Sequence, residues 1–478
     1  MATTTSKLQL TSGPIPKNLF LFTLPILFGN VLQSLNGSVN AIWIGHFLGD
    51  AALTAAANAN TILFFLISGV FGIGMAASIL VGQSMGAKNL DYAKRVVGTG
   101  VVFFIGLSLV TAVFGYYFSP HLMHMMGTPS GALPLAVAYL RIIFIAIPFQ
   151  FAYIFLMMML RGAGDTRTPF LFQLLSVGLD IALNPLLIFG WGPVPGFGIA
   201  GSAMATLMAQ SLSLLALTLY LYWRQHFLVL QRSELFYLRP NTAIIRALVV
   251  KGIPMGLQMM VATLAMILMF TLVNRYGVIT SAAYGACLQL WNYVQMPAIA
   301  VGMAVSTMTA QNIGARQFER LPRIAATGLA FNFVMTGALV GSIYLFNRTA
   351  LGLFLPGHSA ALPVAQHINA LVAWSYIPFG ISFVLFGVMR ASGIVLPPLA
   401  ILTFSFWVVR PGFAWLLMPH WGANALWWSF GAGSMTTVAL AALYYRFGDM
   451  KQKRPMVVGQ AGGSEQAEST MVVPGAAP

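Results

Sequence analysis

Gly82-Gln83-Ser84-Met85-Gly86-Ala87-Lys88 decides the architecture of this chain, because a close copy follows much later as Ala310-Gln311-Asn312-Ile313-Gly314-Ala315-Arg316. The offset between the two glutamines is 311 − 83 = 228. A second pair of stretches shares almost the same offset, since Arg161-Gly162-Ala163-Gly164 matches Arg390-Ala391-Ser392-Gly393 and 390 − 161 = 229. Two motifs at one offset indicate that the chain is an internal duplication.

Gly86 and Gly314 hold equivalent positions in the two copies, each after a long apolar run and shortly before a basic residue. Glycine often ends a helix because it adopts the left-handed conformation without steric cost. We therefore expect both glycines to end their helices in that conformation, while Lys88 and Arg316 anchor the ends at the membrane interface. This role is structural, and the alternative is that the two loops act as gates.

Composition places the chain in a membrane. Hydrophobic residues make up 58% of the 478 residues and charged residues only 7%, which leaves too little polar surface for a soluble protein of this length. A spanning helix needs about 20 largely apolar residues, and the alternating pattern of a β-barrel is absent. Twelve segments qualify: 18–44, 53–82, 96–119, 132–160, 168–190, 199–223, 247–275, 281–311, 326–347, 364–389, 398–418 and 423–446.

Six of these segments fall in each copy of the repeat. The sequence therefore predicts an all-α integral membrane protein with twelve transmembrane helices in two pseudo-symmetric six-helix lobes around a central cavity. We place the N-lobe at 1–223, a cytoplasmic inter-lobe loop at 224–246 and the C-lobe at 247–446. Residues 447–478 are rich in Gly, Ser, Gln, Glu and Pro, which is typical of a disordered cytoplasmic tail.

The net charge of +15 could point to nucleic acid, but the positions of the charges argue against it. Most of the 24 basic residues lie in the segments that are cytoplasmic if both termini are cytoplasmic, as the positive-inside rule requires. Residues 1–17 are polar and contain no cleavable signal. We expect a multi-pass protein of a bacterial inner membrane, a monomer whose partners are the lipid bilayer and small organic substrates.

Asp180 is the acidic residue that the sequence singles out. The chain has nine acidic residues, and Asp180 alone lies deep inside an apolar helix. A carboxylate at that depth is costly unless it is paired, hydrated or protonated, so it indicates function. Desolvation also favours the protonated form, which suits a proton carrier. Gln173, Ser176 and Asn184 lie on the same helix face as Asp180, at i, i+3, i+7 and i+11.

A second polar stripe follows on the next helix, at Ser202, Thr206, Gln210 and Ser213. Two polar stripes on neighbouring helices predict the wall of a hydrated cavity in the N-lobe. The alternative is interhelical hydrogen bonding, which polar side chains commonly supply in membranes. We favour this alternative for Ser202 and Ser213.

Arg410 is the counterpart of Asp180 in the second copy, since 410 − 180 = 230. A basic residue inside a spanning helix also needs a partner. Three roles are open: binding an anionic group, exchanging partners with Asp180, or capping the backbone carbonyls freed by Pro411.

Methionine and aromatic side chains suit a pocket for ligands of many shapes, and aromatic faces attract cations. Most of them pack or face lipid in any membrane protein. The candidates for lining a substrate cavity are Tyr153, Met157, Met259, Met266, Trp291, Tyr293, Trp374 and Tyr376.

At these motifs the chain resembles the multidrug and toxic compound extrusion (MATE) family of drug/cation antiporters. The resemblance rests on the paired Gln-x-x-Gly-Ala loops, on Arg161-Gly-Ala-Gly-Asp165-Thr166, on Asn184-Pro185-Leu186, and on Gly196-Phe-Gly198 with Gly201. It covers residues from about 15 to 446. It implies two lobes around a central cavity, alternating access, and export driven by a proton or sodium gradient.

The chain departs from the pattern of this family at three places. The family's helix-one Asp is replaced by Asn40, which cannot exchange a proton. On helix five the order is Asp180 then Asn184, where many relatives have Asn first. Asn40 and Asn36 can both hydrogen-bond to the displaced carboxylate. The C-lobe acids of the sodium-driven branch are missing, because Glu319 is the only acid between 247 and 446.

We therefore expect export of cationic or amphipathic organic compounds in exchange for protons carried by Asp180. Sodium held by Asp180, Asn and carbonyl oxygens is one alternative. A flippase for a lipid-linked precursor is another, and it requires a strongly basic cavity, for which only Arg410 and the more peripheral Arg141 are available. With one cysteine, no metal-ligand cluster and no nucleophile triad, we expect no cofactor, no metal and no enzyme activity.

Overall fold

The computed structural model describes residues 10–191, 194–356 and 358–448. The expected tail therefore lies outside the described residues from position 449 onward, as do positions 1–9 of the polar N-terminal segment.

The first copy of the repeat folds into six long helices. A short antiparallel hairpin, β1 (Gly190–Trp191) with β2 (Val194–Pro195), joins the last two of them and was not predicted. The helices are α1 (Ile15–Leu48), α2 (Asp50–Gly86), α3 (Leu90–Met125), α4 (Leu133–Gly162), α5 (Arg167–Phe189) and α6 (Ile199–Trp223).

The second copy repeats this order with interruptions. Its tenth and eleventh predicted segments are each broken, the former by a 3-10 turn, η2 (Ala373–Ser375), and the latter by a π-helical stretch, η3 (Ser405–Val409). The helices are α7 (Thr242–Asn274), α8 (Val278–Gly314), α9 (Arg320–Leu345), α10 (Asn347–Gly352), α11 (Ala361–Val372), α12 (Tyr376–Ala391), α13 (Leu396–Phe404), α14 (Arg410–Trp421) and α15 (Asn424–Phe447).

Eleven helical segments within the described ranges are long and apolar enough to cross a membrane. The one predicted segment outside this group is 281–311, which forms α8; this helix has 37 residues and no charged side chain but is less apolar. Its polar residues include Asn292, which hydrogen-bonds to Ser34 of α1. The prediction of an all-helical membrane protein is thus confirmed.

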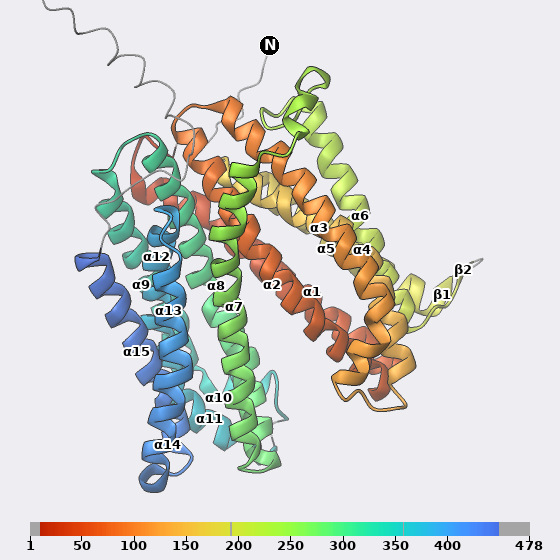
Figure 1. Cartoon of the computed structure of the whole chain (residues 1–478). Coiled ribbons are helices and arrows are strands. Elements are labelled where there is room, and N and C mark those ends of the chain that lie inside the picture. The colour runs from red at the N-terminus through yellow and green to blue at the C-terminus, as the bar shows by residue number, and fades with distance from the viewer. Residues whose placement is uncertain (1–9, 192–193, 357, 449–478) are drawn as a thin grey trace, which may run out of the picture.

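The two copies form two groups of helices that are in contact at one end and diverge toward the other, as Figure 1 shows for α1–α6 and α7–α15. Helix α2 packs against both α7 and α8, and α1 packs against α8. Glycine makes the α2–α7 contact possible, because a Cβ atom on Gly72 would lie 2.2 Å from the backbone nitrogen of Gly256.

The duplicated loops meet each other at the end where the two halves touch. Gln83 Nε2 donates to the carbonyl of Ala391 in the other half at 2.9 Å, and Gln311 Nε2 donates to the carbonyl of Gly162 at 3.0 Å. The donors are offset by 311 − 83 = 228 and the acceptors by 391 − 162 = 229, so the contacts are symmetry-related. We call this pair of hydrogen bonds the glutamine clasp.

The prediction that Gly86 and Gly314 adopt the left-handed conformation is wrong. The left-handed residues are Lys88 and Arg316, with φ of 56° and 57°. Each helix ends in a Schellman turn, with Asn89 N–H donating to Ser84 and Gln317 N–H to Asn312. The glycines serve close approach instead. A Cβ on Gly86 would lie 1.8 Å from the carbonyl oxygen of Gln311, and one on Gly314 would lie 1.9 Å from that of Gln83.

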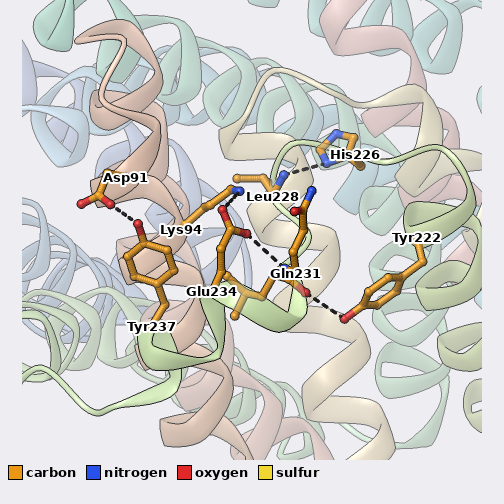
Figure 2. Close-up of polar contacts among 9 residues, drawn as sticks. Asp91, Lys94, Tyr222, His226, Leu228, Gln231, Glu234 and Tyr237 are labelled. Atoms are coloured by element: carbon orange, nitrogen blue, oxygen red, sulfur yellow. Dashed lines mark hydrogen bonds and ion pairs between the residues drawn. The ribbon is translucent and has the colours of Figure 1, made fainter. Parts of the chain in front are cut away.

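The segment between the two halves is not a plain loop, because it contains a 3-10 helix, η1 (Arg232–Leu238), which packs on α3. Figure 2 shows the contacts: Lys94 forms a salt bridge with Glu234 at 2.5 Å, and the Tyr237 hydroxyl donates to Asp91. Gly98 provides the space, since its Cβ would lie 2.3 Å from the Tyr237 carbonyl oxygen.

Candidate functional site

Asp180 lies in the middle of α5 and is 2% exposed. Two side chains of α1 donate to the same carboxylate oxygen: Asn36 Nδ2 and Asn40 Nδ2 each lie 2.8 Å from Oδ2. Both contacts were predicted from the positions of these residues on the first helix. The helix spacing explains them, because residues 36 and 40 are one turn apart on one face.

The second carboxylate oxygen is held by α5 and α6. Thr206 Oγ1 donates to Oδ1 at 3.1 Å, and Asn184 Nδ2 lies 3.4 Å from the same atom. Asn184 Nδ2 also donates to Asn40 Oδ1 and to the Asp180 carbonyl, both at 3.0 Å. Three helices of the first half therefore converge on one carboxylate.

The polarity of these contacts matches an ionised carboxylate, which accepts hydrogen bonds and donates none. Two acceptor oxygens in the same cluster, Asn36 Oδ1 and Asn184 Oδ1, are buried without a hydrogen-bond partner among the described residues. Unpartnered oxygens beside a carboxylate are suitable ligands for a proton-bearing group or a hard cation. The chemistry of the cluster thus suits either a proton-bearing group or a hard metal cation.

Tyr139 of α4 is a member of this neighbourhood that the sequence did not reveal. It is 5% exposed and lies within electrostatic range of Asp180, with Asn60 of α2 beside its hydroxyl. A single Tyr in an apolar helix has no periodic polar partner, so no sequence signal distinguishes it from the many packed aromatic residues.

The remaining polar residues of the two stripes do not contact the carboxylate. Gln173 donates to Gln33 of α1, and Ser176 is buried. Gln210 has a buried, unpartnered Oε1 atom. The hydrogen bonds expected for Ser202 and Ser213 are absent among the described residues, because both Oγ atoms are buried without a partner.

Arg410 is buried in the second half, at the point where the π-helical stretch passes into α14. Its guanidinium lies over the rings of Phe406 and Phe430, 4.0 and 4.6 Å from their centres. Within the described ranges it makes no ion pair with Asp180 and caps no backbone carbonyl. In this conformation, no contact therefore supports partner exchange with Asp180 or the capping of backbone carbonyls, two of the three roles that the sequence left open.

The predicted substrate-cavity residues fall into different places. Met266 and Tyr376 line a small cavity beside Arg410. Trp291 is fully buried and donates to Asn369, while Tyr153 and Met157 pack in a core cluster with Leu217 of α6. These three belong to the packed interior in this conformation. Met259, Tyr293 and Trp374 are half-buried, and Trp374 lies beside the ring of Trp428.

A duplicated bundle of membrane-spanning helices with one buried carboxylate among the described residues is the architecture of a membrane transporter. The MatE family model matches residues 25–186 and again residues 254–416, so the starts of the two matches are offset by 254 − 25 = 229. They cover more than half of the chain, and the chain therefore belongs to the MatE family.

Relatives agree with this assignment. The probable multidrug resistance proteins YoeA and YpnP of Bacillus subtilis are 37% and 34% identical, over 90% and 92% of this chain and 93% and 97% of their own lengths. A MATE structure in the bent conformation has a TM-score of 0.86 at 20% identity, covering 95% of this chain and all of the other. A MOP superfamily transporter from Pyrococcus furiosus also gives 0.86, at 21% identity, with 95% and 100% covered.

Proposed function

We propose that this protein exports small drug-like organic compounds in exchange for protons, and that Asp180 carries the proton. The observation that carries the proposal is the hydrogen-bonded enclosure of Asp180, the one carboxylate buried in a spanning helix of the described chain. The names of the Bacillus subtilis relatives, which are probable multidrug resistance proteins, support the substrate class.

Proton binding requires the enclosure to change its hydrogen bonds. A protonated carboxyl donates one hydrogen bond and so cannot accept at all of its present contacts. Thr206 has a second acceptor at hand, the carbonyl of Ser202 at 3.4 Å, and each Asn can present its oxygen in place of its nitrogen. Because Asn36 and Asn40 belong to α1, a change at Asp180 acts directly on that helix.

Export follows if the proton and the substrate favour different conformations. Protonation of Asp180 from outside would release substrate and permit closure, and deprotonation inside would restore substrate affinity. Such opposing preferences are reciprocal, so each ligand lowers the affinity for the other. With both termini cytoplasmic, the glutamine clasp closes the cytoplasmic side. We also propose that the protein is a monomer and lies in a bacterial inner membrane.

The test is substrate-dependent collapse of an imposed pH gradient in proteoliposomes, measured with and without sodium, for native protein and Asp180→Asn. We expect collapse without sodium in the native protein and none in the variant. Ser213→Ala is the matched control. Ser213 lies on the neighbouring helix α6, and its buried Oγ has no hydrogen-bond partner among the described residues. Collapse that survives Asp180→Asn would place the proton carrier elsewhere.

Sodium coupling is the second candidate, favoured by the two unpartnered oxygens of Asn36 and Asn184. Na⁺, like other hard cations, is coordinated by carboxylate and amide oxygens. Sodium-dependent substrate transport with no movement of protons would overturn the proton mechanism and support this one.

A further inference from the structure

Arg410 is a cation enclosed in the second half of the molecule. It opens α14 and is 5% exposed, with aromatic rings of Phe406 and Phe430 on its guanidinium. Aromatic faces attract a cation electrostatically, but they leave its five N–H donors without the directional acceptors that a carboxylate provides.

No anion neutralises this guanidinium among the described residues, where the one salt bridge joins Lys94 to Glu234. The only acid between positions 247 and 446 is Glu319, at the N-cap of α9. Arg410 Nε is buried and has no hydrogen-bond partner in the part of the chain that the structure describes. An uncompensated buried charge is strongly unfavourable, so a protein that retains one favours an anionic ligand at that place.

A cavity of about 60 Å³ lies beside the guanidinium. It is lined by side chains from α7, α8, α12, η3, α14 and α15, with Ser375 from η2. Hydrogen-bonding groups of Gln295, Ser375, Tyr376 and Ser434 share the lining with Phe379 and Phe406. The size admits a carboxylate group or a small anion rather than a whole drug molecule.

The fold makes room for the arginine at one specific residue. A Cβ on Gly433 of α15 would lie 2.6 Å from Arg410 Cγ and 2.7 Å from Nε. A side chain at position 433 would displace the stem of Arg410, so glycine at this position lets that stem lie against α15 beside the cavity.

The cavity is also connected to the first half by a chain of hydrogen bonds. Gln295 Nε2 donates to Asn292 Oδ1, and Asn292 Nδ2 donates to Ser34 Oγ of α1, both at 3.2 Å. Ser34 precedes Asn36, which holds Asp180. The cavity thus borders the surface where the two halves meet, which is where a substrate enters in an alternating-access transporter.

We propose that Arg410 and its cavity bind the carboxylate group of transported compounds, so that this transporter takes zwitterionic or anionic aromatic amphiphiles. The inference rests on the export function proposed above. It changes the substrate class expected from the sequence, because a cationic drug has nothing to offer a buried guanidinium, whereas an aromatic acid offers a charge-assisted hydrogen bond and a ring.

The binding experiment uses the purified full-length protein and follows its thermal unfolding temperature against concentration of sodium benzoate. Neutral benzamide is the isosteric control, and sodium chloride against sodium gluconate tests a simple inorganic anion. We expect a saturable rise with benzoate, none with benzamide, and an apparent affinity at least about tenfold weaker in Arg410→Gln, with Arg410→Lys in between. Gly433→Ala should weaken the response as well.

Each result bears on the proposal. An equal benzoate response in native protein and Arg410→Gln, or no response in the native protein, overturns it. A response to chloride but not to benzoate would support an anion site at Arg410 and would overturn the proposal that this site binds carboxylate-bearing substrates. If Arg410→Gln does not fold, the benzoate responses of Arg410→Lys and Gly433→Ala, each compared with the benzamide response, test the proposal. Responses equal to that of the native protein overturn it.

A transport arm separates this inference from the proposed function. Rhodamine 110 has a free carboxylate, and rhodamine 123 is its cationic methyl ester. In proteoliposomes we expect Arg410→Gln to slow movement of rhodamine 110 by about tenfold and to leave rhodamine 123 within about twofold. Equal loss of both dyes contradicts the role of the carboxylate. Native protein that responds to benzoate but moves neither dye contradicts export while leaving the site intact.

Discussion

At the scale of single residues, the exchange of Asp and Asn along α5 is the most informative departure of this chain. Asn184 is fully buried, its Nδ2 lies 3.0 Å from Asn40 Oδ1, and it stands one turn from Asp180. A carboxylate at either position therefore lies beside Asn40 of α1. The neighbourhood, rather than the residue number, should decide whether a proton can be carried.

The double exchange Asp180→Asn with Asn184→Asp tests this idea. We expect it to recover proton coupling to within about tenfold of the native rate, since every donor near the carboxylate remains within one helical turn. Asp180→Asn alone should recover none. The measurement is the rate of pH-gradient collapse at matched reconstitution levels. A double variant as inactive as the single one would show that the position of Asp180 itself is required.

The sequence predicted the contacts of Asp180 with Asn36 and Asn40 because all three are polar residues on helical faces in an otherwise apolar chain. The same reasoning missed Tyr139, whose hydroxyl is carried by a ring that packs like any aromatic residue. It also missed the partner of Asn292, because Ser34 lies 258 positions away and no periodicity links them. Contacts across helices depend on rotation and depth, which a pattern of spacing does not encode.

At the scale of elements, the ends of α2 and α8 depend on glycine for contact between the two halves. Gly86→Ala places a methyl group 1.8 Å from the Gln311 carbonyl oxygen, which is backbone and cannot rotate away. We expect a destabilisation of this conformation of about 1–3 kcal/mol, as for overpacked cores. The measurement is a lower thermal unfolding temperature. Gly337→Ala on α9, where nothing lies within 4 Å, is the control; an equal effect in both would remove the argument.

The packing of η1 on α3 gives a second prediction for an element. The hydrogen bond from Lys94 lowers the pKa of the Glu234 carboxyl from its usual 4.5. Because the lowered pKa belongs to the folded form, the attachment contributes above pH 4.5 and is lost as pH falls through the lower value. Hydrogen exchange of residues 232–238 should therefore be constant above pH 4.5, after correction for intrinsic rates, and should speed up below it.

Gly98→Ala should release η1 at every pH, because its methyl group would lie 2.3 Å from the Tyr237 carbonyl oxygen. Lys94→Met should reduce the pH dependence, because only the Gln231 backbone N–H then donates to Glu234, and should leave the packing of Tyr237. Unchanged exchange in Gly98→Ala would mean that η1 is held by other contacts. The sequence predicted this segment as a loop, since a 3-10 helix of seven residues has no apolar period to reveal it.

At the scale of the whole molecule, the repeat predicted the architecture, because one nearly constant offset aligns loops, helices and prolines alike. It did not predict where the copies differ. The π-helical stretch before Arg410 and the turn at Ala373–Ser375 interrupt segments that read as continuous apolar helices. Nor did it predict which loop atoms meet across the two halves, since that depends on their relative placement in one conformation.

The glutamine clasp should determine how often the molecule occupies this conformation. It consists of two symmetry-related buried hydrogen bonds between the halves, at 2.9 and 3.0 Å. At about 0.5–1.5 kcal/mol each, loss of both in Gln83→Leu with Gln311→Leu should shift the conformational equilibrium roughly 5- to 150-fold. Spin labels at Ser130 and Val278, both exposed, would report the separation of the halves at the end away from the clasp.

We expect the distance distribution between these labels to gain a shorter component when both glutamines are replaced, with Cys287 changed to serine in every sample. Each single variant should lie between the native protein and the double variant, because the two bonds are equivalent by symmetry. Gln173→Leu is the matched control, since its partner Gln33 belongs to the same half of the chain. A double variant whose distances equal those of the native protein would show that the glycine contacts at Gly86 and Gly314 hold the halves together without the clasp.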